Sequence, residues 1–184
     1  VSSVTDMSGM FFHADSFDKN ISSWDVSSVT DMSSMFWATG KFNEDINSWD
    51  VSSVTDMSGM FAYTDSFDGD ISDWDVSSVE DMSGMFKNAE VFNGDLSSWN
   101  VGNVADMSAM FRGDSNTNSS FNGDISGWDV SSVTDMGYMF ENADGFSGDL
   151  SGWSVPYICS EPDNFDSGAG SINHPNWSIV CLNP

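Results

Sequence analysis

A long motif recurs along the chain at a fixed spacing, and this periodicity constrains the fold more than any other feature. Its form is I-S-x-W-D-V-S-S-V-T-D-M-S-x-M-F, followed by a variable tail with a second Phe. The valine after the Trp-Asp step falls at Val26, Val51, Val76, Val101, Val130 and Val155, so the period is 25 residues with one unit of 29. Such a period predicts a solenoid in which equivalent residues stack into columns.

The repeats divide the 184-residue chain into two parts. Residues 1–154 form a six-unit repeat array, and residues 155–184 differ enough to be a C-terminal cap. The long unit places polar residues at 112–120 where its neighbours have about five, which predicts an extended surface loop. We therefore expect one elongated domain with a cap, and a natural protein that is longer at its N-terminus.

The apolar spacing within one unit predicts a short parallel strand and a short helix. Trp49-Asp50-Val51 has the alternation of a strand. From Val54 the spacing changes to three, three and one, which is typical of one helix face and buries the Met and Phe columns. Ser53 followed by Asp56 resembles a capping box at the helix start. The predicted fold class is an α/β, leucine-rich-repeat-like solenoid.

The charge of the chain limits its partners. Four Lys and Arg against 29 Asp and Glu give a net charge of -25, which repels nucleic acid and anionic membrane surfaces. No apolar run is long enough to span a membrane. The 14 Phe, 12 Met and 8 Trp stand at regular places, so a packed core is expected rather than disorder.

Two cysteines, Cys159 and Cys181, both lie in the cap. A pair of thiols without further ligands favours one disulfide over a metal site, and a disulfide favours an extracellular compartment. The two histidines, His13 and His174, have no nucleophile beside them in the pattern, so we expect no enzymatic activity.

The repeated stretch F-N-G-D-I-S-x-W-D-V-S-S-V-T-D-M-S-x-M-F resembles the repeat of BspA-like leucine-rich-repeat surface proteins of bacteria and microbial eukaryotes. The resemblance covers residues 1–154. It implies a secreted or surface-displayed protein with a role in adhesion, and it brings no catalytic residues.

The residue between Trp and Val of each unit forms a column that should face outward. Its members are Asp25, Asp50, Asp75, Asn100, Asp129 and Ser154. Like charges about 5 Å apart in water repel by about 0.8 kcal/mol, so the ladder needs a balancing partner. Three balancing partners are possible. They are hydrogen bonds in the following turn, Ca2+ bound by Asp25, Asp50, Asp75 and Asp129, or a basic or hydroxylated ligand on this face.

Small polar residues flank this ladder, among them Ser48 and Asp73. Together they make a flat polar strip suited to a peptide or a glycan. We therefore predict a non-catalytic interaction or adhesion module, monomeric by itself, that binds an extracellular protein or glycan. An architectural spacer in a larger surface protein is the alternative. Ice binding is a weaker one, because Glu80 and Ala105 interrupt the column of Thr residues.

Overall fold

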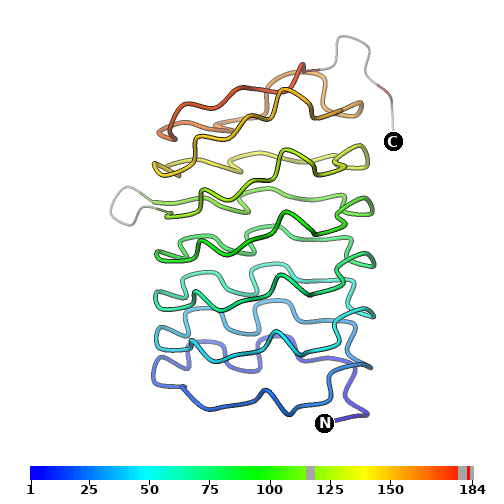
Figure 1. Cartoon of the computed structure of the whole chain (residues 1–184), viewed down its shortest axis with the longest axis vertical. Coiled ribbons are helices and arrows are strands. Elements are labelled where there is room, and N and C mark those ends of the chain that lie inside the picture. Colours follow the sequence, from blue (N-terminus) through cyan, green and yellow to red (C-terminus); the bar gives the residue numbers. More distant parts are fainter. Residues whose placement is uncertain (115–118, 178–181, 183–184) are drawn as a thin grey trace.

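The computed structural model describes residues 1–114, 119–177 and 182. These residues wind into coils that stack along one axis, from the N-terminus at the bottom of Figure 1 to the C-terminal segment at the top. One repeat makes one coil: the Phe61 N–H donates to the Met85 carbonyl in the next coil at 2.9 Å. The equivalent bond from Phe111 reaches Met139, also at 2.9 Å, so the stacking register is kept across the longer unit.

The described residues contain neither a helix nor a continuous strand. Regular pairing is limited to isolated parallel bridges between single residues of neighbouring coils. They join Asp6 to Asp31, Asp31 to Asp56, Asp56 to Asp81, Asp81 to Asp106, Asp106 to Asp135, and Asp149 to Asn173. The predicted α/β leucine-rich-repeat-like architecture, with one strand and one helix per unit, is therefore wrong.

The segment expected to be a helix is a series of tight turns whose N–H groups donate in two directions. The Met60 N–H closes a turn onto the Met57 carbonyl at 3.1 Å. The N–H groups at positions 57, 59, 61 and 63 instead donate to carbonyls of the next coil at 2.7 to 3.0 Å. A helix requires each N–H to bond the carbonyl four residues earlier. The apolar spacing fits both arrangements, and the neighbouring coil supplies the acceptors that decide between them.

These turns require left-handed backbone at two positions of a coil. The first column comprises Gly9, Ser34, Gly59, Gly84, Ala109 and Tyr138, and the second His13, Ala38, Tyr63, Asn88 and Asn142, all with φ between 53° and 61°. This conformation is the one that a type II turn needs at its third residue. For residues other than Gly it costs about 1–2 kcal/mol, a cost that the contacts between coils must offset.

Two glycines of the first column should respond differently to replacement by Ala. Gly84→Ala meets no atom closer than 3.8 Å, so we expect it to lower the free energy of unfolding only by the backbone cost, about 1 kcal/mol. Gly59→Ala has the same φ of +59° and also sets a Cβ 2.8 Å from the Trp37 ring, so its loss should be larger by about 1 kcal/mol or more. Urea unfolding of both variants tests this. Equal losses would show that the Trp37 ring yields without cost.

The expected strand is absent because side chains make the bonds between coils there. Trp49 Nε1 donates to the Ile21 carbonyl at 3.1 Å, and Ser53 Oγ donates to the Ser27 carbonyl at 3.0 Å. The same indole bond joins Trp74 to Ile46, Trp99 to Ile71, Trp128 to Leu96 and Trp153 to Ile125. Carbonyls that a strand would pair with backbone N–H groups are thus satisfied by side chains.

The Asp column expected to cap helices stabilises turns instead. Asp56 Oδ1 accepts the Ser58 N–H at 2.8 Å, which is an Asx-turn. Asp6, Asp31, Asp81, Asp106 and Asp135 do the same with the residue two positions later. Because the described residues hold no helix for these side chains to cap, the capping-box interpretation is wrong.

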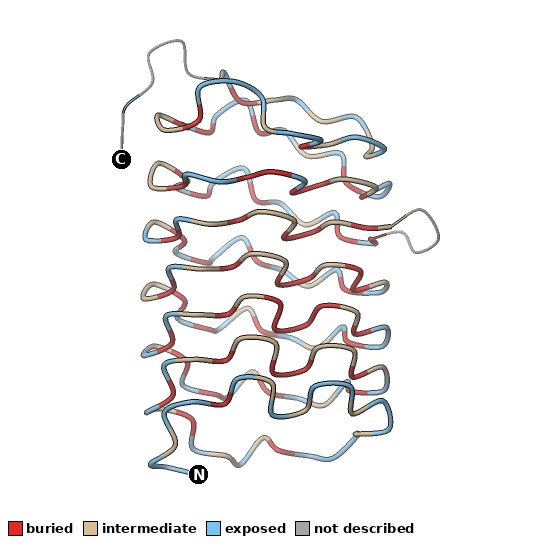
Figure 2. Ribbon diagram, turned by 180° about the vertical axis from the view of Figure 1, so that it is seen from behind, coloured by how far each residue is buried: buried red, intermediate tan, exposed pale blue. Residues whose placement is uncertain are grey.

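The core is a continuous stack of apolar columns inside the coils. Figure 2 shows buried segments recurring in successive coils. Phe61 and Phe67 of one coil stack with ring centroids 4.1 Å apart, and Phe61 lies 5.7 Å from Phe86 of the next coil. The Met columns are buried as expected, except that Met10 in the first coil is 42% exposed. Ring stacking at this spacing continues through the array and holds the coils in register.

Part of the expected cap and loop lies outside the described residues. Cys181 and residues 115–118 belong to this part, so the disulfide from Cys159 and the middle of the 112–120 loop stay predictions. The boundary at residues 154 and 155 is likewise a prediction. Within the described residues, no helix is long and apolar enough to cross a membrane.

Candidate functional site

All six members of the predicted ladder are exposed, Ser154 included. We call its five Asp and Asn members the first acidic row: Asp25, Asp50, Asp75, Asn100 and Asp129. Each member accepts the backbone N–H of the residue two positions later through Oδ1, at 3.1 to 3.3 Å. These are Asx-turns, the first of the three ways of balancing the like charges. The bonds fix how each side chain is oriented on the surface.

The same contacts favour the charged form of three carboxylates of this row, Asp25, Asp75 and Asp129. The Ser27 hydroxyl donates to Asp25 Oδ1 at 2.6 Å and, with the Ser27 N–H, lowers the pKa of Asp25 below its ordinary value of 3.8. The hydroxyl and N–H of Ser77 lower the pKa of Asp75 in the same way. Ser131 does so for Asp129. Hydrogen bonds to the charged form favour that form, so these carboxylates are negative at neutral pH.

The two flanking residues of the predicted strip contact neighbouring coils. Ser48 Oγ donates to the Ser22 carbonyl at 3.4 Å. Asp73 exchanges two bonds with Asn47: its N–H donates to Asn47 Oδ1 at 3.2 Å, and Asn47 Nδ2 donates to Asp73 Oδ2 at 3.0 Å. Both side chains are exposed but partly committed to holding the coils together.

A second acidic row was not among the predicted site residues. It consists of Asp45, Asp70, Asp95, Asp124 and Asp149, all exposed. Each accepts an N–H two residues later through Oδ1, at 2.9 to 3.1 Å. Its signal in the sequence is the Asp that precedes Ile or Leu in every unit after the first, where Asn20 stands instead. Both rows therefore have the same construction and the same period.

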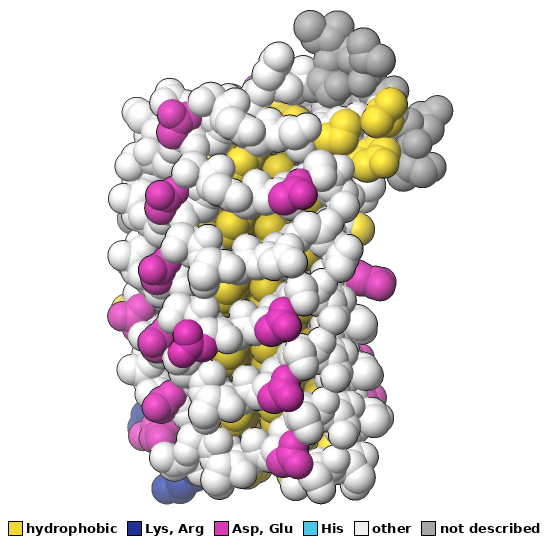
Figure 3. All heavy atoms as spheres, turned by 45° about the vertical axis from the view of Figure 1, so that its right-hand side comes forward, with side chains coloured by type: hydrophobic (Ala, Val, Ile, Leu, Met, Phe, Trp, Pro, Cys, Tyr) yellow, Lys and Arg dark blue, Asp and Glu magenta, His cyan; other side chains and the backbone are white. Residues whose placement is uncertain are grey.

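The second row lies beside a shallow polar pocket of about 360 Å³. Asn43, Asp45, Asn47, Asp68, Gly69 and Asp70 line it. Neighbouring carboxylates of the row interact: the N–H and hydroxyl of Ser72 lower the pKa of Asp70, and the negative charge of Asp95 opposes this shift. Figure 3 shows acidic side chains in two rows along one face of the stack. We call the first and second rows together the acidic face.

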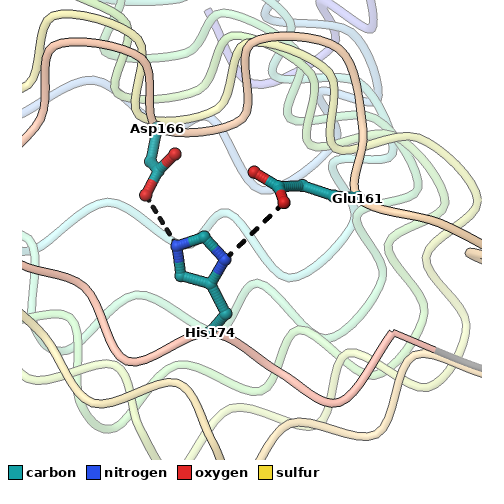
Figure 4. Close-up of side chains that lie close together, drawn as sticks. All are labelled: Glu161, Asp166 and His174. Carbon is teal, nitrogen blue, oxygen red and sulfur yellow. Dashed lines mark hydrogen bonds and ion pairs between the residues drawn. The ribbon is translucent and has the colours of Figure 1, made fainter.

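A different group of titratable side chains lies in the C-terminal segment. His174 Nε2 is 2.7 Å from Asp166 Oδ2, and His174 Nδ1 is 4.0 Å from Glu161 Oε2. Figure 4 shows the imidazole between the two carboxylates. The sequence pattern does not indicate that Asp166 and Glu161 lie beside His174.

Among the described residues, this trio is the one group of three or more His, Cys, Asp or Glu side chains whose ligand atoms all lie within 4.8 Å of one another. The acidic rows offer one carboxylate per coil and form no such group there. A cation on the rows would thus need backbone, amide or water oxygens in addition to carboxylates.

Comparison with known proteins bears on the family. One family model matches residues 1–89 and again residues 69–177, which together cover most of the chain. No curated protein matches the chain, and no solved structure does. The resemblance to BspA-like leucine-rich-repeat proteins is therefore corrected, since the matching model is that of another family. The chain belongs to the family described as Mycoplasma protein of unknown function, DUF285.

Proposed function

We propose that the protein is a non-catalytic interaction module whose acidic face binds an extended, positively charged partner. The observation that carries this proposal is the construction of the rows. Each Asx-turn bond ends on Oδ1 of an exposed Asp. A carboxylate has about four acceptor sites, so the second oxygen of each side chain is left to accept hydrogen bonds from a partner.

The regular spacing supports a polymeric partner over a small molecule. Equivalent residues of bridged coils lie about 4.8 Å apart, so several carboxylates face a partner that lies along the stack. The net charge of -25 would speed association with a cationic partner by long-range attraction. A Lys- or Arg-rich segment of an extracellular protein fits these requirements, and the proposal includes an extracellular or cell-surface location.

The test removes charge from the first row without removing its turns. Asn100 already accepts the Gly102 N–H through Oδ1 at 3.2 Å, so Asn keeps this bond. We expect Asp50→Asn with Asp75→Asn to weaken binding of a fluorescent octalysine peptide about fivefold, as two exposed charge pairs contribute about 1 kcal/mol together. Fluorescence anisotropy at 50 mM and 200 mM salt measures this, and the higher salt should weaken wild-type binding.

The control is Asp65→Asn with Asp144→Asn, which changes the net charge equally at exposed positions outside both rows. This control should change the Kd less than twofold. Equal losses in both double variants would show that only the net charge matters. Failure of the wild-type protein to bind the peptide would favour the architectural spacer. A melting temperature that rises with Ca2+ in wild type but not in Asp50→Asn with Asp75→Asn would favour cation bridging.

A further inference from the structure

The C-terminal segment continues the stack as one more, altered layer. Tyr138, Phe140 and Asn142 donate their N–H groups to the carbonyls of residues 163, 165 and 167 at 2.7 to 2.9 Å. Left-handed backbone recurs at Asn164 and Gly168. These bonds reproduce the pattern between the preceding coils. They place residue 166 at the position of Phe140.

Two positions of this layer that face the core elsewhere carry polar side chains. Asp166 occupies the column in which the earlier coils have Phe36, Phe61, Phe86, Phe111 and Phe140, all at most 1% exposed. The bridge between Asp149 and Asn173 places His174 beside Leu150. Leu150 belongs to the buried Ile and Leu column. The final layer thus replaces two apolar columns with a carboxylate and an imidazole that meet at 2.7 Å.

The surroundings of this pair are apolar on one side and acidic on the other. The rings of Phe165 and Trp177 meet the His174 ring edge-on, with centroids 6.1 and 6.2 Å away. The side chains of His174 and Asp166 are 32% and 24% exposed, and Glu161, the third member, is 50% exposed. An ion can therefore reach the group from solvent, while aromatic rings limit the motion of the imidazole.

We propose that Glu161, Asp166 and His174 form a site for one divalent transition-metal ion, with Zn2+ as the preferred ion. Imidazole nitrogen with carboxylate oxygen is a donor set that Zn2+ accepts, whereas Ca2+ takes six to eight oxygens. Neighbouring ligands of a tetrahedral Zn2+ stand about 3.4 Å apart. The three ligand atoms here all lie within 4.8 Å of one another. To bind the ion, the contact of 2.7 Å between His174 Nε2 and Asp166 Oδ2 lengthens and the exposed Glu161 side chain turns toward the ion. Water completes the coordination.

This site would fasten the end of the stack. Asp166 stands on the turn of the final layer and Glu161 lies just before this turn. His174 stands on the following segment, which bridges to Asp149. An ion bound to all three connects the two segments in the folded state only, so its binding energy adds to stability. The role is independent of the acidic face and of any partner bound there.

The test is titration with ZnCl2, followed by calorimetry and by thermal unfolding. We expect calorimetry to show one tight Zn2+ site in the wild type, and saturating Zn2+ to raise the melting temperature. CaCl2 at the same concentration should give the same melting temperature as NaCl at equal ionic strength. His174→Gln and Glu161→Gln should each weaken the tight site at least tenfold. The matched controls are His13→Gln, at the other histidine, and Glu80→Gln, at an exposed acid outside the trio.

The two variants at the site separate ligation from folding. Glu161 is half exposed, so Glu161→Gln should keep the far-ultraviolet circular dichroism and the unfolding curve of the wild type without metal. Tight Zn2+ binding that survives in both variants would overturn the proposal. So would an equal shift of the melting temperature by Ca2+, because that result would assign the effect to charge alone.

Discussion

Replacing Phe86 by Ala is expected to lower the free energy of unfolding by about 3–5 kcal/mol. Phe86 is 1% exposed and stacks on Phe92 in its own coil at 4.0 Å. Its ring centroid also lies 5.7 Å from Phe61 below and 5.8 Å from Phe111 above. Removing the ring therefore opens a cavity and interrupts the aromatic column in the middle of the stack.

Guanidinium unfolding followed by circular dichroism measures this loss. Because each coil contacts only its neighbours, a weakened central contact should also divide unfolding into two transitions, one for each half of the stack. The control is Phe12→Ala, at a Phe that is 51% exposed in the first coil, which should change stability by less than about 0.5 kcal/mol. Similar losses in the two variants would contradict the continuous core.

Acidification is expected to lower the melting temperature. Among the residues that the structure describes, eight carboxyl groups have a pKa below the ordinary value of 3.8, because hydrogen bonds, chiefly from the residue two positions later, favour their charged form. They are Asp6, Asp25, Asp70, Asp75, Asp95, Asp124, Asp129 and Asp149. A lowered folded-state pKa contributes stability above the unfolded pKa, and that contribution is lost as the pH falls through the folded pKa. The loss should thus begin near pH 4 to 5 and grow below it.

Protonation also relieves repulsion within a chain of net charge -25, an effect of opposite sign. The salt concentration separates the relief of repulsion from the loss of the ionised turns. High salt screens the repulsion between exposed charges but leaves the hydrogen bonds of the turns in place. At 0.5 M NaCl the acid loss should therefore be larger than at 20 mM.

The matched variant is Asp70→Asn with Asp95→Asn and Asp124→Asn, which keeps the acceptor oxygens and cannot titrate. It should lose less stability than wild type between pH 5 and pH 2.5, as followed by melting curves. A melting temperature that rises on acidification at 0.5 M NaCl would contradict the stabilising role of the ionised turns.

The sequence predicted the period and the buried columns correctly, because both depend on which side chains must leave water. Val54, Met57, Met60 and Phe61 are all fully buried, as their spacing indicated. The predicted secondary structure was wrong, because the same apolar spacing fits both a helix and a series of turns. Which one forms depends on whether an N–H finds its acceptor in its own segment or in the next coil, 24 residues away.

The two candidate sites also differ in how far the sequence alone predicts them. The first acidic row could be predicted from the sequence because its residues repeat. Asx-turns were one of the three predicted ways in which the repulsion between its carboxylates could be balanced. The trio of Glu161, Asp166 and His174 does not repeat. It is assembled only when the last layer stacks in register on the coil below, so no spacing in the sequence indicates it.

By itself the sequence determined that the chain stacks in units of 25 residues, which columns are buried, and where the first acidic row runs. A side chain at a repeated position meets the same environment in each interior coil, so the pattern carries this information. The tertiary structure decided that the units contain turns in place of helices and strands, and that a His and two acids converge at the end of the stack. Both follow from bonds between layers, whose partners are distant in the chain and are brought together only by stacking.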